Sequence, residues 1–155
     1  MMIVLFTQPL NTLPTETLKV EKRQASDETV LDLIPIGEFT NTQHNVRGMV
    51  WAYNNTLMLI EDFAYDGFGF GVYFQVATKG RNRNAWVANR KTIGYPNPED
   101  FGTPLEKAYG TNPDKVDWIV LRMPSDILVQ DIKWMTVWCD QFHISFGEVK
   151  FPSFV

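Results

Sequence analysis

The chain has 155 residues, a length that suits one domain with a buried core. Its net charge of -4 argues against general nucleic-acid binding, which needs clustered Lys and Arg to neutralise phosphates. A single cysteine excludes an internal disulfide, and no apolar run approaches the roughly 18 residues that a membrane span needs.

Residues 1–36 are predicted to form an N-terminal arm or the first strands, and residues 37–155 the main domain. The apolar stretch at residues 1–6 indicates a short first strand, because it lacks the basic n-region and the small-residue cleavage site of a signal peptide. The polar stretch that follows holds Pro9 and Pro14 and is typical of an exposed arm.

Residues 46–53 alternate between apolar and polar side chains, which predicts a strand. Asn54 and Asn55 tolerate a positive φ, and residues 56–61 resume the strand pattern, so the stretch predicts a β-hairpin. Asn54-Asn55-Thr56 is also a glycosylation sequon, usable if the chain is secreted.

The Gly-rich stretch at residues 66–71 does not indicate a phosphate cradle, because no helix N-terminus follows and no Lys, Ser or Thr stands at the usual place. We expect strands at residues 72–77 and 85–88, with a basic, polar turn at residues 79–84 between them. Thr103 as N-cap, Pro104 and Glu106 form a capping box, which predicts one short helix at residues 103–110.

Residues 116–121 and 132–151 alternate with period two and predict the last strands. Strands at this spacing, rich in aromatic residues, favour an all-β fold: an antiparallel β-sandwich or barrel-like sandwich with one short helix. The expected core residues are Trp118, Val120, Ile132, Trp134, Phe142, Ile144 and Phe146.

Cys139 stands beside Asp140, where the two final strands meet. It is either an inert thiol that packs as a small hydrophobe or a redox-active one. Asp140 disfavours a thiolate, so a reactive thiol needs a cation from elsewhere, such as Arg47 or His143. His143 follows Cys139 by four residues and is either its partner across a turn or a surface histidine.

His44 precedes the first hairpin and is either a cap for backbone groups or a ligand. Glu61, Asp62 and Asp66 are acidic neighbours, but their spacing matches no calcium loop, so a solvated turn is expected and no metal site is predicted. Trp51, Trp134 and Trp138 are expected in the core or at its rim, where exposed rings would be able to stack on sugars.

Four sequence pieces, in this order and spacing, resemble the DM-thirteen domain, a module of DOMON-associated extracellular proteins of the Skeletor and Knickkopf type. They are His44-Asn45-Val46-Arg47-Gly48, residues 57–63, Tyr65-Asp66-Gly67 with Val72-Tyr73-Phe74, and Val137-Trp138-Cys139 with Phe142 and Phe146-Gly147-Glu148-Val149. The resemblance covers residues 37–151. It implies an all-β fold, an extracellular setting, and a characteristic cysteine, here Cys139, as a redox thiol or a ligand to a prosthetic group such as haem.

The resemblance therefore favours an extracellular redox or electron-transfer module centred on Cys139, with a DOMON-type domain as redox partner. His44 and His143 are further candidates beside it. The alternative is a non-catalytic module that binds a matrix or cuticle protein or a polysaccharide. A hydrolase has little support, because no paired carboxylates or His-rich metal spacing stand out.

Overall fold

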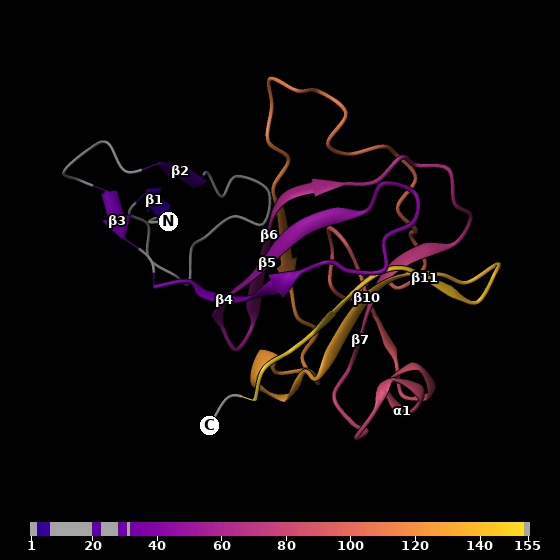
Figure 1. Cartoon of the computed structure of the whole chain (residues 1–155). Helices are drawn as coiled ribbons and strands as arrows, with labels where there is room; N and C mark the ends of the chain where they lie inside the picture. Colours follow the sequence, from indigo (N-terminus) through magenta and orange to yellow (C-terminus); the bar gives the residue numbers. More distant parts are fainter. Residues whose placement is uncertain (1–2, 7–19, 23–27, 31, 154–155) are drawn as a thin grey trace.

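The computed structural model describes residues 3–6, 20–22, 28–30 and 32–153 (Figure 1). In the N-terminal part, three short strands pair antiparallel in the order β2-β1-β3. They are β1 (Ile3–Phe6), β2 (Val20–Lys22) and β3 (Glu28–Val30). The strand expected at residues 1–6 is thus present from Ile3 to Phe6.

The first large sheet has the strand order β4-β5-β6-β9, with every neighbouring pair antiparallel. Its strands are β4 (Ile34–Glu38), β5 (Arg47–Asn54), β6 (Leu57–Ala64) and β9 (Ile119–Arg122). The predicted hairpin between β5 and β6 is confirmed. Asn54 Oδ1 accepts a hydrogen bond from the Thr56 backbone N–H at 2.8 Å and so closes the turn.

The second large sheet has the strand order β11-β10-β7-β8 and is also antiparallel. Its strands are β7 (Val72–Ala77), β8 (Lys91–Ile93), β10 (Trp134–Cys139) and β11 (Ile144–Lys150). A 3₁₀ turn at Val129–Asp131 leads into β10. Because β10 lies between β7 and β11, all six of its residues are buried.

One apolar core joins the two large sheets, because every second residue of their strands faces it. Its members include Val50, Ala52, Met58 and Ile60 from the first sheet and Val72, Phe74, Val76, Met135, Val137 and Cys139 from the second. The prediction of an all-β antiparallel sandwich is confirmed, and the sheets do not close into a barrel.

The predicted core is correct for some residues and wrong for others. Ile132, Trp134 and Phe146 are buried. In β9, Ile119 and Leu121 fill the core, while Trp118 and Val120 are only half-buried. Phe142 and Ile144 are 61% and 37% exposed. The pairing of β10 with β11 shifts at a bulge between Val137 and Trp138, so the alternation seen from Phe146 onward does not extend back to the turn.

The helix predicted at residues 103–110 is wrong. The Leu105 N–H donates to the Val72 carbonyl at 2.8 Å, and Tyr109 pairs with Tyr65 as an isolated bridge. These strand-like bonds and the burial of Leu105 outweigh the local capping preference. The helix of the domain is instead α1 (Arg83–Ala88), where a short strand was expected, and Asn82 Oδ1 caps it by accepting from the Ala85 N–H.

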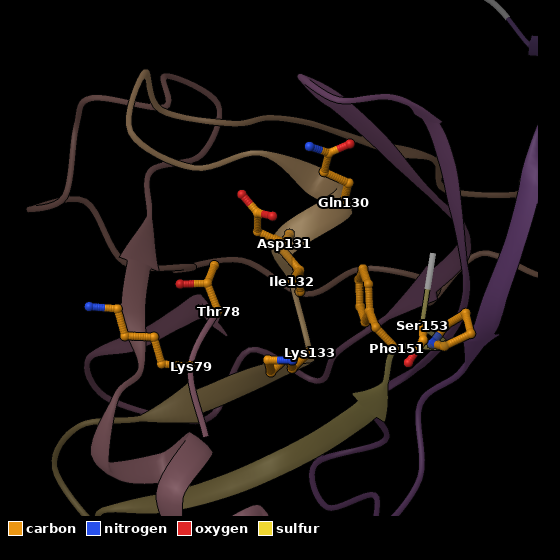
Figure 2. Close-up of a pocket in the computed structure, with 9 residues that line it drawn as sticks. Thr78, Lys79, Gln130, Asp131, Ile132, Lys133, Phe151 and Ser153 are labelled. Carbon is orange, nitrogen blue, oxygen red and sulfur yellow. The ribbon is translucent and has the colours of Figure 1, made fainter. Parts of the chain in front are cut away.

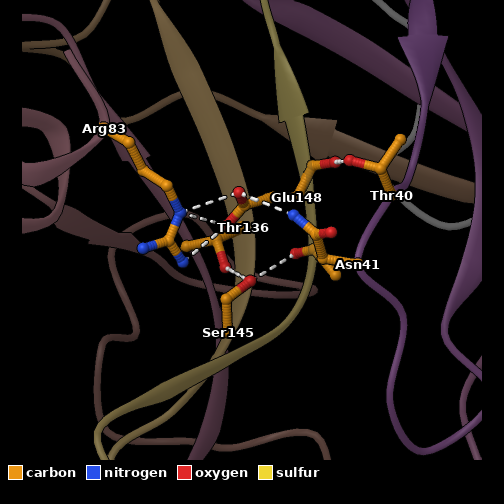
Figure 3. Close-up of polar contacts among 7 residues, drawn as sticks. Thr40, Asn41, Arg83, Thr136, Ser145 and Glu148 are labelled. Carbon is orange, nitrogen blue, oxygen red and sulfur yellow. Dashed lines mark hydrogen bonds and ion pairs between the residues drawn. The ribbon is translucent and has the colours of Figure 1, made fainter.

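The outer face of the second sheet carries Trp134, Thr136 and Trp138 from β10, and α1 covers it with Trp86 and Val87. A polar cluster at this face includes Glu148, which is only 7% exposed (Figure 3). Glu148 accepts from Arg83 Nε at 2.8 Å and from Asn41 Nδ2 at 3.3 Å. This side of β10 is thus buried under polar contacts, and the other under apolar ones.

Candidate functional site

Cys139 is the last residue of β10, and its side chain lies on the inner, core-facing side of the sheet. The residue is 0% exposed. Its backbone pairs with Val72 of β7 on one side and with Ile144 of β11 on the other. The thiol donates a hydrogen bond to the Phe70 carbonyl at 3.3 Å. The thiol is therefore an interior group held against the loop that precedes β7.

That loop, residues 66–71, is called the cover loop here. The Asp140 N–H donates to its Gly71 carbonyl at 2.8 Å, and its Gly69 N–H donates to the Tyr65 hydroxyl at 2.8 Å. A Cβ on Gly69 would lie 2.8 Å from both Phe146 Cε2 and Tyr65 Oη, which is closer than side chains pack. Only glycine lets the loop lie this close to the core beside Cys139.

Tyr65 is fully buried beneath the cover loop. Burial raises the pKa of its phenol, the hydrogen bond from Gly69 opposes that rise, and negative charge on Asp66 or Cys139 adds to it. The side chain is therefore a neutral phenol at physiological pH. Its electrostatic coupling to Cys139 puts the two groups in one neighbourhood.

His44 anchors the start of the cover loop. It has a left-handed backbone, with a φ of 54°. Its Nδ1 lies 3.1 Å from each carboxylate oxygen of Asp66, and its ring packs on Phe146 with the ring centroids 4.2 Å apart. The Asp66 N–H donates to the His44 carbonyl at 3.0 Å, and Asp66 Oδ1 accepts from the Phe68 N–H at 2.9 Å. His44 thus fixes the position of Asp66 and, through it, of the loop.

The two cations that the sequence suggested for the thiol lie elsewhere. His143 is an exposed residue in the turn between β10 and β11, with a φ of 54°. Arg47 is exposed and pairs with Asp62 at 3.3 Å. Among the described residues, neither side chain makes a hydrogen bond or ion pair with Cys139.

The acidic residues Glu61, Asp62 and Asp66 each have a partner of their own. Glu61 accepts from Trp51 Nε1 at 3.3 Å, while Asp62 and Asp66 bind Arg47 and His44. Within the described part of the chain, no three His, Cys, Asp or Glu side chains gather in a way that would hold a metal ion. No helix in that part is long and apolar enough to cross a membrane.

Three surface pockets are lined by residues distant from Cys139 in the sequence. The first, of about 400 Å³, lies where β7 ends and β10 begins, and Thr78, Lys79, Asp131 and Lys133 line it (Figure 2). The second, of about 490 Å³, includes Glu38, Arg47 and Glu61, and the third, of about 320 Å³, includes Lys91 and Phe101. None of them reaches Cys139 or His44.

These observations bear on the haem that the resemblance suggests. The thiol sulfur of Cys139 is enclosed by core side chains and hydrogen-bonded to Phe70. A porphyrin needs an open slot beside its ligand, and none of the three pockets adjoins the thiol. The residues around Cys139 therefore do not fit a haem ligated by this sulfur in the present conformation.

Sequence reasoning found Cys139 but missed the groups around it. Tyr65, Gly69 and the Phe70 carbonyl are the groups that enclose or contact the thiol. Their signal was present in the alternation of Phe and Gly at residues 67–71, which is unusual for a plain turn. Phe68 and Phe70 are 79% and 71% exposed, so their side chains do not serve the core.

Comparison with known proteins gives two matches to one family. A family model described as Electron transfer DM13 matches residues 38–151. Protein Skeletor, isoforms B/C, of Drosophila melanogaster is 33% identical over 117 residues, which cover 76% of this chain and 14% of that protein. Isoforms D/E of Protein Skeletor have the same identity over the same length, which is 7% of their chain. The chain thus spans a small part of these relatives, and no solved structure matches it.

Proposed function

The chain belongs to the Electron transfer DM13 family, and from this premise we propose that it is a redox module whose active group is the Cys139 thiol beneath the cover loop. The observation that carries the proposal is the contact between Cys139 and the Phe70 carbonyl at 3.3 Å. Through it, one Gly-rich loop holds the thiol and covers it.

The chemistry proposed is thiol–disulfide exchange. Deprotonated Cys139 attacks a disulfide of a partner molecule, its sulfur forms a new S–S bond, and the partner's other sulfur leaves as a thiolate that takes up a proton. Cys139 is oxidised and the leaving sulfur is reduced, so atoms and electrons balance. Because the chain has no second cysteine, the product is a mixed disulfide with the partner.

Exposed apolar side chains around the cover loop support docking of such a partner. Phe68 and Phe70 lie on the loop, and Phe142 and Ile144 lie at the adjacent hairpin turn. Together they expose roughly 400 Å² of apolar surface, as large as the patches that mark interaction sites. That area suits a small, short-lived interface, which is common among electron-transfer partners.

The test is the rate at which the full-length protein reacts with glutathione disulfide and with Ellman's reagent. We expect a slow reaction in the native protein, and at least tenfold acceleration in Gly69→Ala, which forces the cover loop away from Phe146 and Tyr65. Phe101→Ala, at an exposed apolar residue outside the cover loop and the adjacent turn, is the matched control and keeps the native rate. Cys139→Ser gives no mixed disulfide by mass spectrometry.

A rate that follows global unfolding in every variant, at equal melting temperatures, would show that Cys139 only packs in the core. The absorption spectrum tests the other redox arrangement. Since the surroundings of the thiol do not fit haem, we expect no Soret band after reconstitution with haemin. A Soret band that Cys139→Ser abolishes would overturn the thiol mechanism.

We also propose that the chain works outside the cell, with a DOMON-type domain as the first redox partner to test. Support comes from its likeness to Protein Skeletor and from the exposed sequon asparagine, Asn54, at the β5–β6 hairpin turn. In cells that express the full-length gene, surface biotinylation and an Asn54→Gln variant test this. A protein found only inside the cell, with no glycosidase-sensitive shift, contradicts it.

A further inference from the structure

Positive charge is concentrated in one segment of this acidic chain. Residues 79–91 contain no Asp or Glu, although the chain has a net charge of -4. The basic residues of the segment are Lys79, Arg81, Arg83, Arg90 and Lys91. The basic, polar turn seen in the sequence is therefore part of a larger island of positive charge, which the redox proposal does not use.

The fold brings further lysines to this segment. The Lys133 N–H donates to the Ala77 carbonyl at 2.8 Å, so Lys133 lies beside the end of β7 and lines the same pocket as Lys79 (Figure 2). Trp134 pairs with Ala77 on one side and with Lys150 of β11 on the other. Lys79, Arg81, Lys133 and Lys150 are all exposed, and we call them the basic face.

The charges of the basic face are available to a ligand. Arg83 and Lys91 are bound to Glu148 and Asp126. In contrast, no ion pair formed within the described residues involves a member of the basic face. An external anion would not have to displace an internal carboxylate in order to bind there.

The turn that presents Lys79 and Arg81 is held in place. Gly80 has a φ of 116°, and a Cβ there would lie 2.8 Å from Ala85 Cβ, so the turn packs directly on α1. Trp86 Nε1 donates to the Gly80 carbonyl at 2.9 Å, and Asn82 caps the helix. Because the backbone is already ordered, little conformational entropy is lost when a ligand binds.

The pocket beside the basic face has the lining of a sugar site. Its volume is about 400 Å³, and Thr78, Gln130, Asp131 and Ser153 contribute hydroxyl, amide and carboxylate groups. Such groups donate to and accept from sugar hydroxyls. Asp131 would repel a nucleic acid, whose duplex carries one charge per about 1.7 Å, but it can accept a hydrogen bond from a hydroxyl group.

We propose that the basic face and this pocket bind an acidic polysaccharide, one whose sugars carry sulfate or carboxylate groups. The four cations bind the anionic groups, and the pocket takes a sugar ring with its hydroxyls. This surface lies apart from Cys139, so the inference stands or falls independently of the redox proposal.

The test uses heparin as probe, with the full-length protein in about 0.15 M NaCl. The charge-reversal variant Lys79→Glu/Arg81→Glu should bind at least about tenfold more weakly than the unmodified chain, since each lost phosphate-like contact reduces the salt-dependent affinity. Lys107→Glu/Lys115→Glu changes the net charge equally at exposed lysines outside the basic face and should stay within about twofold. Lys133→Gln is the second variant should the first not fold.

Two further probes decide the class of ligand. Desulfated heparin and single-stranded DNA of similar length should each bind at least about tenfold more weakly than heparin. The inference is overturned if heparin does not bind at this salt concentration, if both charge-reversal variants weaken binding equally, or if DNA or the desulfated chain binds as tightly as heparin.

Discussion

The two faces of β10 are both buried, but in chemically different surroundings. On the inner face, Met135, Val137 and Cys139 meet only the apolar core of the sandwich, apart from the thiol's bond to Phe70. On the outer face, Thr136 donates to Ser145 Oγ at 2.8 Å, next to the Glu148–Arg83 pair (Figure 3). One strand thus serves an apolar core and a polar layer at once.

The difference shows that burial alone does not say how a residue contributes to stability. The inner face is stabilised by apolar contact, which is non-directional. The outer face depends on directional bonds, and some of its groups lack them: Nε1 of Trp134, Nε1 of Trp138 and Oε1 of Gln75 are buried with no partner among the described residues. Substitutions on the two faces should therefore have different costs.

The largest effect is expected at the inner face. Phe146→Ala removes a fully buried ring that packs on His44 and Tyr65, and should lower the free energy of unfolding by roughly 3–5 kcal/mol. Phe142→Ala, at a ring 61% exposed on the same hairpin, should change it by less than about 0.5 kcal/mol. Urea denaturation measures both, and similar losses in the two variants would contradict the structure.

On the outer face, Arg83→Ala should cost less, about 1–3 kcal/mol. It leaves the Glu148 carboxylate, 7% exposed, with Asn41 as its remaining side-chain partner. The cost stays below that of a fully buried pair because the Arg83 side chain is 52% exposed. Arg81→Ala removes a neighbouring arginine without an ion pair and serves as control. Equal stability of the two variants would show that the pair adds nothing.

Alkaline titration should act through the inner face. Burial is the main cause that raises the pKa of Tyr109 to about 12, and it also raises the pKa values of Tyr65 and Tyr95. The unfolded chain ionises these phenols near pH 10, so their stabilising contribution is complete below pH 10 and is lost as the pH rises towards 12. The free energy of unfolding should fall less steeply over this range in Tyr109→Phe. Parallel curves would exclude this contribution.

The smallest change is expected for Trp134→Phe, although Trp134 is among the largest fully buried side chains. The substitution costs ring contacts but also removes a buried N–H without an acceptor, and the two effects oppose each other. We expect a change within about 1 kcal/mol by thermal or urea denaturation. A loss as large as that of Phe146→Ala would mean that the indole N–H is bonded after all.

The sequence alone predicted the sandwich and most strand positions, because period-two patterning and turn residues are local signals. It missed the strand face in β9, where Trp118 and Ile119 are both apolar and only the partner sheet decides which side chain turns inward. It also placed the helix wrongly, because the capping residues at 103–106 are outweighed by backbone bonds to Val72 and Tyr65, which are distant in sequence.

Of the candidate site, Cys139 was identified from the family resemblance, whereas its surroundings could not be inferred. The Phe70 carbonyl is a backbone group 69 residues away, and no side-chain pattern marks it. The separation of His143 from the thiol depends on where the hairpin turn falls, which is one of the least local features of a strand pair.

The contact of residues 40–43 with β11 has a consequence for association between chains. Gln43 N–H donates to the Phe146 carbonyl, and Thr40 exchanges two backbone bonds with Glu148 at 2.8 and 3.0 Å. Without this segment, β11 would end its sheet with a row of unpaired amides and carbonyls, a template for strand addition and aggregation. Pro35 in β4 and the three-residue length of β8 blunt two other sheet ends. The domain can thus present exposed phenylalanines at one end and still resist polymerising through its strands.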